Sequence, residues 1–521
     1  MANYVTNDCW AGIHGGRDMA VEAARAVRLL HLSDLHCTRG RSNDRAIVLR
    51  ALVSDVAQTA GSDNLDFVVF SGDMASSGAQ SEYEAAFEDL VVPLLEALHL
   101  DTDRFFLCPG NHDVNRARLN SVVAGGLRSL SDRDEVNQAI DGFGDGTVSV
   151  AGLGLGEFEE FRNSVSARPS GPSLCATYRF SCRGSAVSVA CLNTAWRAGK
   201  DVLPLLGERQ LDCALAECTG VDICIAVMHH PAEALHDFLV VKHLLRGFHV
   251  ICTGHHHLDD AQMISRSDGS ATVFSAASCL YRSRTDPIGY SIIEIDHGSG
   301  RVELVRRVYS DRFRRFECAA GTSSVFEITL SRTGLQPLFT YDQRSAAEGP
   351  INGRLLPTVA NSTLAPRSLR DIFVEPLLFE DTEYRQDPAR RAIPLKTILE
   401  GSDDILFIGN RETGKTTLLD YVCLWHLDEA PGIVPARIAF SAIKEEGRNK
   451  VFRTISDYLS SLGILPTNLD DLCTRGAVIA LIDDIDFAAS KRVEAIQEFA
   501  LQYPACRLMM TASDNPMSGM F

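Results

Sequence analysis

Seven side chains that can bind metal ions follow five short apolar stretches in the N-terminal half of the chain. Carboxylate, amide and imidazole groups together suit manganese, iron, zinc or nickel better than calcium, which prefers oxygen ligands. Each residue alone has an ordinary explanation, since an Asp after a strand is usually a helix cap. Seven of them at five strand ends are better explained by a metal centre, formed by Asp34, His36, Asp73, Asn111, His229, His255 and His257.

These residues lie where a sheet would bring them together. Strands are predicted at 27–32, 67–71 and 105–108, with helices between them at 45–59 and 81–98. This alternation favours a parallel sheet, and ligands bind at the carboxyl edge of such a sheet. After a Gly-rich loop region at 141–156, strands are predicted at 177–181 and 186–192. A helix at 208–217 follows, and then further strands at 223–228, 248–253, 271–275, 289–295 and 302–309.

The order of the short motifs is itself informative. Asp-x-His, Gly-Asp, Gly-Asn-His-Asp, His-His-Pro and Gly-His-x-His occur in this order, and the order resembles the calcineurin-like metallophosphoesterase family over about residues 28–310. The resemblance implies an α/β fold, a four-layer sandwich with two sheets, and a dinuclear site. One ion would be bound by Asp34, His36 and His257, the other by Asn111, His229 and His255, with Asp73 as the bridge.

The resemblance also implies a reaction. Two divalent ions would polarise the phosphorus and convert a bridging water to the hydroxide that attacks it. His112 would be the general acid for the leaving alkoxide, and Asp113 would either orient His112 or cap a helix. His230 and His256, beside the ligands, would support or line the site or be inert. The substrate would be a phosphodiester or phosphomonoester in a nucleotide or nucleic acid.

A second motif lies in the C-terminal part of the chain. Residues 409–416 match G-x-x-x-x-G-K-T, between a strand predicted at 404–408 and a helix. Such a loop surrounds phosphates with backbone N–H groups, and its Thr holds magnesium together with an acid at the end of a later strand, here predicted at 477–482. The expected ligand is ATP or GTP with magnesium, bound by Gly409, Gly414, Lys415, Thr416, Thr417, Asp483 and Asp484.

This part resembles the start of a STAND-type P-loop NTPase of the NACHT group. The segments 371–376 and 507–511 are similar to the leading segment and the sensor strand of that group. Two features depart from it, because Phe487 replaces the final acid of D-x-x-D-E and Ala512 stands where a sensor arginine is usual. Nucleotide binding is therefore expected, and hydrolysis is left open. Members of the group continue further, so the module is expected to be incomplete at its C-terminus.

The domains expected are an N-terminal extension at 1–27, a metallophosphoesterase at 28–317, a linker at 318–370 and a P-loop NTPase at 371–521. The function predicted is that of a hydrolase controlled by a nucleotide-binding module that self-assembles, typical of effectors in bacterial anti-phage defence. One alternative is a signalling NTPase or scaffold with an inert phosphoesterase-like domain. The other is a housekeeping cyclic-nucleotide phosphodiesterase.

The composition of the chain bears on nucleic-acid binding, on the state of the cysteines and on the location of the protein. Of the 521 residues, 45% are hydrophobic, and the formal net charge of -18 argues against broad, nonspecific nucleic-acid binding. Six arginines between Arg301 and Arg315 form either a local basic surface or a solvated strand pair. The 15 cysteines lack C-x-x-C spacing and are expected to be free thiols. Neither a signal peptide nor an apolar run of ~20 residues is found, so a cytoplasmic protein without membrane contact is predicted.

Overall fold

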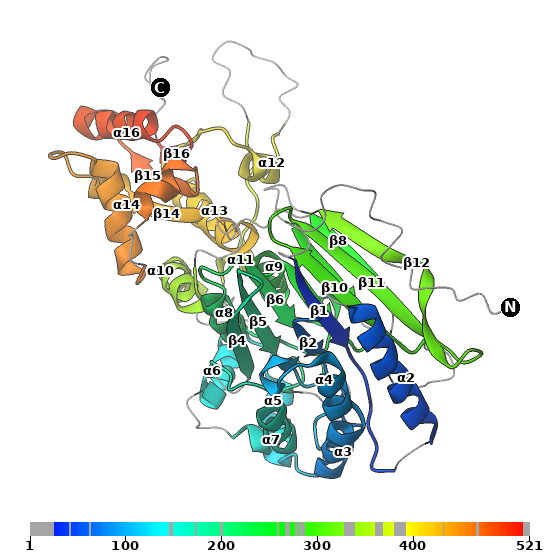
Figure 1. Ribbon diagram of the computed structural model, residues 1–521. Coiled ribbons are helices and arrows are strands. Elements are labelled where there is room, and N and C mark those ends of the chain that lie inside the picture. The colour runs from blue at the N-terminus through cyan, green and yellow to red at the C-terminus, as the bar shows by residue number, and fades with distance from the viewer. Residues whose placement is uncertain are drawn as a thin grey trace. The chain divides into compact units, whose positions relative to one another are not determined.

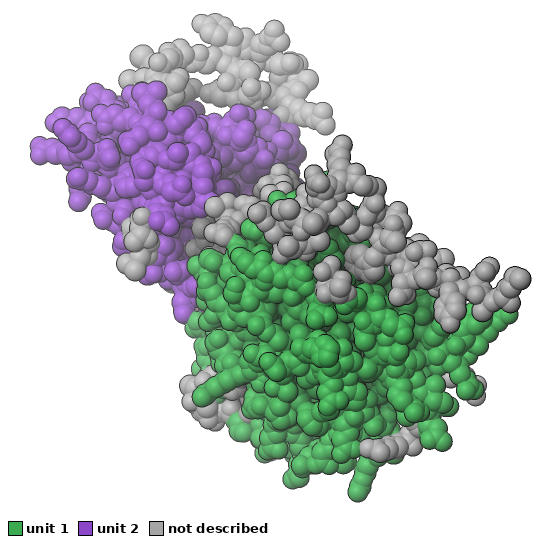
Figure 2. Space-filling model, viewed as in Figure 1, with its two compact units in different colours: residues 1–336 green, residues 337–521 purple. Residues whose placement is uncertain are grey.

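The computed structural model divides into two compact units, residues 1–336 and 337–521 (Figure 2). It describes residues 26–40, 43–61, 64–144, 149–171, 174–197, 202–257, 260–265, 271–276, 280, 287–327, 339–359, 368–379, 392–430, 432–464 and 468–513. The expected N-terminal extension, apart from its last two residues, lies outside these ranges.

The first unit contains two six-stranded sheets (Figure 1). The first sheet has the order β12-β11-β10-β1-β2-β3 and is formed by β1 (Val27–Leu32), β2 (Phe67–Phe70), β3 (Phe105–Leu107), β10 (Gly289–Asp296), β11 (Arg301–Ser310) and β12 (Arg315–Glu327). The second has the order β4-β5-β6-β7-β9-β8 and is formed by β4 (Cys175–Cys182), β5 (Ser185–Leu192), β6 (Ile223–Val227), β7 (Val250–Thr253), β8 (Asp260–Ser265) and β9 (Ala271–Ala276). The predicted parallel pairing holds for β1, β2 and β3. In addition, β5, β6 and β7 pair in parallel, whereas β10, β11 and β12 run antiparallel to their neighbours.

Alternating side chains on the strands build the layers. On β1, Val27 and Leu29 belong to a core shared with strands of the second sheet, whereas Leu30 and Leu32 belong to a core shared with helices. The helices over the first sheet include α2 (Asn43–Ala60), α3 (Gln80–Ala86) and α4 (Val92–Leu98). The second sheet is covered by α8 (Glu208–Glu217) and α9 (Phe238–Gly247). The result is helices, sheet, sheet, helices, which is the four-layer arrangement that the resemblance implies.

Three helices between β3 and β4 differ from the expected pattern. They are α5 (Ser121–Ser129), α6 (Arg133–Gly144) and α7 (Gly156–Val165), and the end of α6 falls in the region predicted as a Gly-rich loop. Gly125 and Gly126 lower the helix propensity of α5. Burial of Leu127, Ile140 and Phe143 in the core beneath the first sheet outweighs that cost.

The second unit has its own parallel sheet of four strands, in the order β13-β16-β15-β14. The strands are β13 (Ile405–Ile408), β14 (Val434–Ala439), β15 (Val478–Ile485) and β16 (Arg507–Ala512). The helices are α10 (Tyr341–Val359), α11 (Leu369–Ile372), α12 (Leu395–Glu400), α13 (Lys415–Glu429), α14 (Lys450–Ser461), α15 (Leu469–Thr474) and α16 (Ser490–Gln502).

The expected linker at 318–370 is wrong in its extent. Strand β12 continues to Glu327 because it pairs with β11 along its length. Helix α10 also lies in this range, and it buries Ala347 and Ile351 in the core of the second unit. That unit therefore starts at about residue 337 rather than 371.

The arginines near β11 and the cysteines were also subjects of prediction. At least three of the six arginines near β11 form ion pairs, Arg307 with Asp55, Arg301 with Glu303 and Arg315 with Glu317, which favours the strand-pair interpretation. Twelve of the described cysteines are free thiols, but Cys318 is disulfide-bonded. No helix in the described part of the chain is long and apolar enough to cross a membrane.

Candidate functional site

The loops that follow β1 and β2 run side by side and place two carboxylates next to each other. The Asp34 N–H donates to the Gly72 carbonyl at 3.0 Å, and the His36 N–H donates to the Asp73 carbonyl at 2.9 Å. Asp34, His36 and Asp73 have left-handed φ values of 55°, 45° and 56°. His255 and His257, after β7, have the same backbone conformation. Non-glycine residues rarely adopt it, and it is concentrated at functional sites.

The first group of predicted ligands surrounds Asp34. Its Oδ1 lies 3.3 Å from His257 Nε2 and 3.7 Å from His36 Nε2. The other oxygen, Oδ2, accepts hydrogen bonds from Ser33 Oγ at 2.5 Å and from the His255 N–H at 3.2 Å. These two bonds fix the carboxylate so that Oδ1 faces the two imidazoles.

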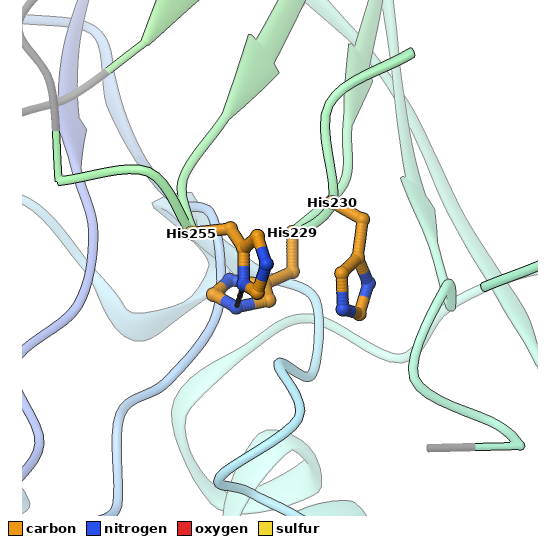
Figure 3. Close-up of side chains that lie close together, drawn as sticks. All are labelled: His229, His230 and His255. Carbon is orange, nitrogen blue, oxygen red and sulfur yellow. Dashed lines mark hydrogen bonds between the residues drawn. The ribbon is translucent and has the colours of Figure 1, made fainter. Parts of the chain in front are cut away.

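The second group surrounds His229, which follows β6. His229 Nε2 lies 3.2 Å from Asn111 Oδ1 and 3.3 Å from His255 Nδ1, the contact drawn in Figure 3. The opposite nitrogen, Nδ1, lies 2.9 Å from the Ser71 carbonyl and must donate to it. His229 therefore carries a proton on Nδ1, which makes Nε2 the nitrogen that would bind a metal ion.

Asp73 joins the two groups through a single oxygen. Its Oδ2 lies 3.7 Å from His36 Nε2 and 3.3 Å from His229 Nε2. Its Oδ1 accepts the backbone N–H of His112 at 2.7 Å. The same atom thus faces both groups, which is the position required of a bridging ligand.

The donor set fits two divalent ions. Ligand atoms about 2.1 Å from one ion are about 3.0–3.4 Å apart in octahedral or tetrahedral geometry, and the contacts above are 3.2–3.7 Å. A Cβ at Gly110 would overlap the Asp73 carboxylate, and one at Gly254 would overlap Ser33 Oγ. All seven residues predicted as ligands are brought together here.

The charges in the site favour a cation. Burial opposes ionisation of Asp34, but hydrogen bonds from His257 and His36 outweigh it and hold its pKa well below the usual range. Burial likewise opposes a charge on His229, yet Asp73 and Asp34 raise its pKa to about 9. Two buried carboxylates that stay ionised and draw a proton onto a neighbouring imidazole create a negative potential, which divalent ions would neutralise.

The predicted pairing of Asp113 with His112 is wrong. His112 is exposed, and its Nδ1 donates to the Ser76 carbonyl at 2.9 Å. Asp113 is buried and accepts from Ala75 N at 2.9 Å, Gly110 N at 2.9 Å, Met74 N at 3.3 Å and the Tyr83 hydroxyl at 3.0 Å. Burial and the charge of Asp73 raise its pKa to about 6. It is also no helix cap, because residues 111–114 form a bend; instead it ties together the loops after β2 and β3.

The two histidines beside the ligands differ in their surroundings. His230 is buried, and its Nδ1 lies 2.9 Å from Thr194 Oγ1. His256 is exposed, with Glu233 at 4.0 Å. Sequence reasoning missed the supporting groups Ser33, Ser71, Ser76 and Thr194. Ser33 follows a predicted strand and Ser71 ends one, but a carbonyl or hydroxyl that orients a ligand leaves no motif.

In the second unit, the glycine-rich loop connects β13 to α13 as predicted. Lys415 Nζ donates to the carbonyls of Gly409 and Asn410 at 2.8 and 2.7 Å. Thr416 Oγ1 lies 3.3 Å from Asp483 Oδ1, so these two predicted magnesium ligands are adjacent. Arg437 Nη2 donates to Asp483 Oδ2 at 2.8 Å, a partner that the sequence did not indicate.

The remaining predicted residues of this loop region lie at its edges. Gly414 has a left-handed φ of 83° and precedes α13. Gly414 and Thr417 line a cavity of about 1010 Å³ whose walls are mostly apolar and include Phe373 and Phe407. Asp484 is exposed, and its backbone N–H donates to Thr511 Oγ1 at 2.8 Å.

Comparison with known proteins gives a family match within the first unit. Residues 27–259 match the family described as calcineurin-like phosphoesterase. Comparison with curated protein sequences gives no match.

Among solved structures, a predicted phosphoesterase from Streptococcus pneumoniae is 12% identical with a TM-score of 0.24, covering 58% of this chain and 97% of its own. Zinc-bound Vps29 from Entamoeba histolytica is 9% identical with a TM-score of 0.24, covering 58% and 100%. Vps29 from Chaetomium thermophilum is 9% identical with a TM-score of 0.27, covering 58% and 97%. At these values, none of the three indicates what this chain binds or does. Residues 27–259 are nevertheless a calcineurin-like phosphoesterase domain, by the family match.

Proposed function

We propose that the first unit is a metal-dependent phosphoesterase that hydrolyses a phosphodiester or phosphomonoester of a nucleotide or nucleic acid. The observation that carries this proposal is the position of Asp73 Oδ2, which faces His36 on one side and His229 on the other. One ion would be held by Asp34, His36, Asp73 and His257, and the second by Asp73, Asn111, His229 and His255. When bound, two such ions neutralise phosphoryl charge and activate water.

His112 supplies the proton for the leaving group in this proposal. Its ring centroid is 4.7 Å from that of His36, so it lies at the margin of the metal-binding group. Because Nδ1 donates to the Ser76 carbonyl, Nε2 is the nitrogen left for proton transfer. A protonated Nε2 would donate to the departing alkoxide oxygen. General acids of this kind accelerate reactions about 100- to 10,000-fold.

The test is a substrate panel assayed with Mn²⁺: bis-p-nitrophenyl phosphate, cyclic nucleotides, and single- and double-stranded DNA. Asp73→Asn should lose turnover of every substrate. His112→Gln should lose about 100-fold or more on alkoxide-leaving substrates and much less on bis-p-nitrophenyl phosphate, because nitrophenolate leaves without a proton. Asp103→Asn, at an exposed position, is the matched control. No turnover by the metal-loaded wild type would support an inert, scaffold-like domain instead.

The second unit carries a further candidate function. We propose that it binds ATP or GTP with magnesium and regulates the phosphoesterase, in a nucleotide-driven self-assembly that serves anti-phage defence. The adjacency of Thr416 and Asp483 at the end of the glycine-rich loop supports nucleotide binding. Lys415→Ala should abolish nucleotide binding and remove any effect of ATP on phosphoesterase rate. A wild-type rate that is the same with and without bound ATP would contradict the regulatory role.

A further inference from the structure

The imidazole of His230 lies beside the second ligand group, next to His229 and His255 (Figure 3). One ring nitrogen from each of His229, His230 and His255 lies within 4.8 Å of those of the other two. The His230 ring centroid is 5.1 Å from that of His229 and 4.6 Å from that of His255. His230 could therefore act as an additional metal ligand or as a hydrogen-bond donor. The two roles require opposite tautomers, because a ligating nitrogen must present a lone pair and a donating nitrogen must carry a proton.

Thr194, a buried residue in the loop after β5, distinguishes these roles. Its Oγ1 lies 2.9 Å from His230 Nδ1 and accepts the His230 backbone N–H at 3.2 Å. Within the described ranges, no other group hydrogen-bonds to this hydroxyl. The hydroxyl proton needs an acceptor, since a buried donor without one costs about 1–3 kcal/mol. His230 Nδ1 is that acceptor, so Nδ1 is unprotonated and the proton of the neutral ring is on Nε2.

Consecutive histidines are thus held in opposite tautomers. The Ser71 carbonyl accepts a hydrogen bond from His229 Nδ1–H, which leaves Nε2 for a metal ion. Thr194 donates to His230 Nδ1 and leaves an N–H at Nε2. The difference arises from the group that contacts each Nδ1. At His229 it is a carbonyl, which can only accept, and at His230 it is a hydroxyl, which must donate.

We propose that His230 is a substrate-positioning residue, whose Nε2–H hydrogen-bonds a nonbridging oxygen of the phosphoryl group next to Asn111, His229 and His255. This inference rests on the proposed phosphoesterase function. A fixed N–H donor aimed at phosphoryl oxygen orients the substrate without adding a charge to the site. The chemical class recognised is a tetrahedral phosphate ester or free phosphate.

The tautomer is tested first, in protein labelled with ¹⁵N-histidine and loaded with diamagnetic Zn²⁺. Long-range ¹H–¹⁵N correlation should show His230 protonated on Nε2 and His229 protonated on Nδ1. Thr194→Ser, which retains the hydroxyl, should preserve the His230 pattern, whereas Thr194→Val should change it. A His230 ring protonated on Nδ1 in the wild-type protein would overturn the proposal.

Binding is tested next, with inorganic phosphate as the probe. His230→Phe should still bind two Zn²⁺ ions per chain by calorimetry, and its affinity for phosphate should fall about 10-fold or more, the worth of one hydrogen bond to a charged group. His230→Gln, which keeps an N–H donor, should recover part of that loss. Loss of one ion in His230→Phe would make His230 a ligand, and unchanged phosphate affinity would remove its positioning role.

The two proposals fail separately. If the wild type binds two ions and phosphate but turns over no phosphoester, the proposed function fails while the phosphate-binding role of His230 can still be measured. If the wild type is active and His230→Phe retains both full phosphate affinity and wild-type KM, the positioning role alone is overturned.

Discussion

The carboxylates of the metal-binding groups each divide their two oxygens between different tasks. Asp34 uses Oδ2 for Ser33 and the His255 N–H, and Asp73 uses Oδ1 for the His112 N–H. In each case the second oxygen is turned towards imidazole nitrogens. Such supporting hydrogen bonds orient a ligand before the ion arrives and reduce the cost of arranging it. The precision of the site therefore depends on hydrogen-bonding groups that are not themselves metal ligands.

Asp113 is one such supporting residue, and its effect should appear in stability. Asp113→Ala removes a buried acceptor from Ala75 N, Gly110 N and the Tyr83 hydroxyl. We expect the free energy of unfolding in urea at pH 7.5 to fall by about 2–4 kcal/mol. Asp103→Ala, at an exposed position, should change it by less than about 0.5 kcal/mol. An Asp113→Ala protein that keeps wild-type stability but loses activity would mean that Asp113 acts on His112 directly.

His249 predicts a dependence of stability on pH. It is buried before β7, its Nδ1 accepts the Cys224 N–H at 3.0 Å, and burial, aided by His297, lowers its pKa to about 4. Because the folded-state pKa is below the unfolded value of about 6.5, the contribution of His249 is complete above pH 6.5 and is lost as pH falls towards 4.

The variant His249→Asn keeps an acceptor near the position of Nδ1 but cannot titrate. Between pH 7.5 and 5.5, it should lose about 1.4 kcal/mol less unfolding free energy than the wild type. Urea denaturation at the two pH values measures the difference. Equal losses in both proteins would show that His249 does not resist protonation in the folded state.

At the scale of elements, the site depends on strand ends that approach one another closely. The loops after β2 and β3 meet at Gly110, where a Cβ would overlap the Asp73 carboxylate and backbone. Gly110→Ala should therefore displace Asp73 and weaken the binding of Mn²⁺ by about 10-fold or more. Changes that disturb the orientation of a metal ligand typically reduce metal affinity by about 10- to 100-fold. Titration calorimetry with Mn²⁺ measures this affinity.

Gly125→Ala is the matched control for that substitution. A Cβ at Gly125 meets nothing within 4 Å, and Gly125 lies within α5. This variant should keep wild-type metal affinity and gain about 0.5–1 kcal/mol of stability from helix propensity. Equal metal affinities of Gly110→Ala and Gly125→Ala would show that the approach at Gly110 does not determine the position of Asp73.

The sequence predicted strand ends better than it predicted the contacts made there. Apolar runs that end in Asp or His identify β1, β2, β6 and β7, because buried parallel strands and ligand side chains both leave clear patterns. The partner of His112 could not be found this way, since Ser76 contributes a backbone carbonyl that any residue carries. Asp113 was assigned to the wrong role because its neighbour in sequence is not its neighbour in space. Helices α5 to α7 were missed because their burial comes from distant segments.

At the scale of the whole molecule, two candidate sites lie in two units with separate hydrophobic cores. Ligands that bind only folded protein stabilise it, by about 2.7 kcal/mol at 100 times Kd. Thermal unfolding with Mn²⁺ should therefore show a stabilisation that Asp73→Asn loses and Lys415→Ala retains. The stabilisation by ATP and Mg²⁺ should be retained in Asp73→Asn and lost in Lys415→Ala. Loss of both stabilisations in either variant would show that the two sites cannot be separated as we propose.

The central claim is that seven side chains form one dinuclear centre bridged by Asp73. Crystals of the Mn²⁺-loaded protein, measured at the manganese absorption edge, test it most directly. We predict two anomalous peaks about 3.5–4 Å apart, one on each side of Asp73 Oδ2, with His230 and Asp113 outside both coordination spheres. A single peak, or two peaks without Asp73 between them, would contradict this account.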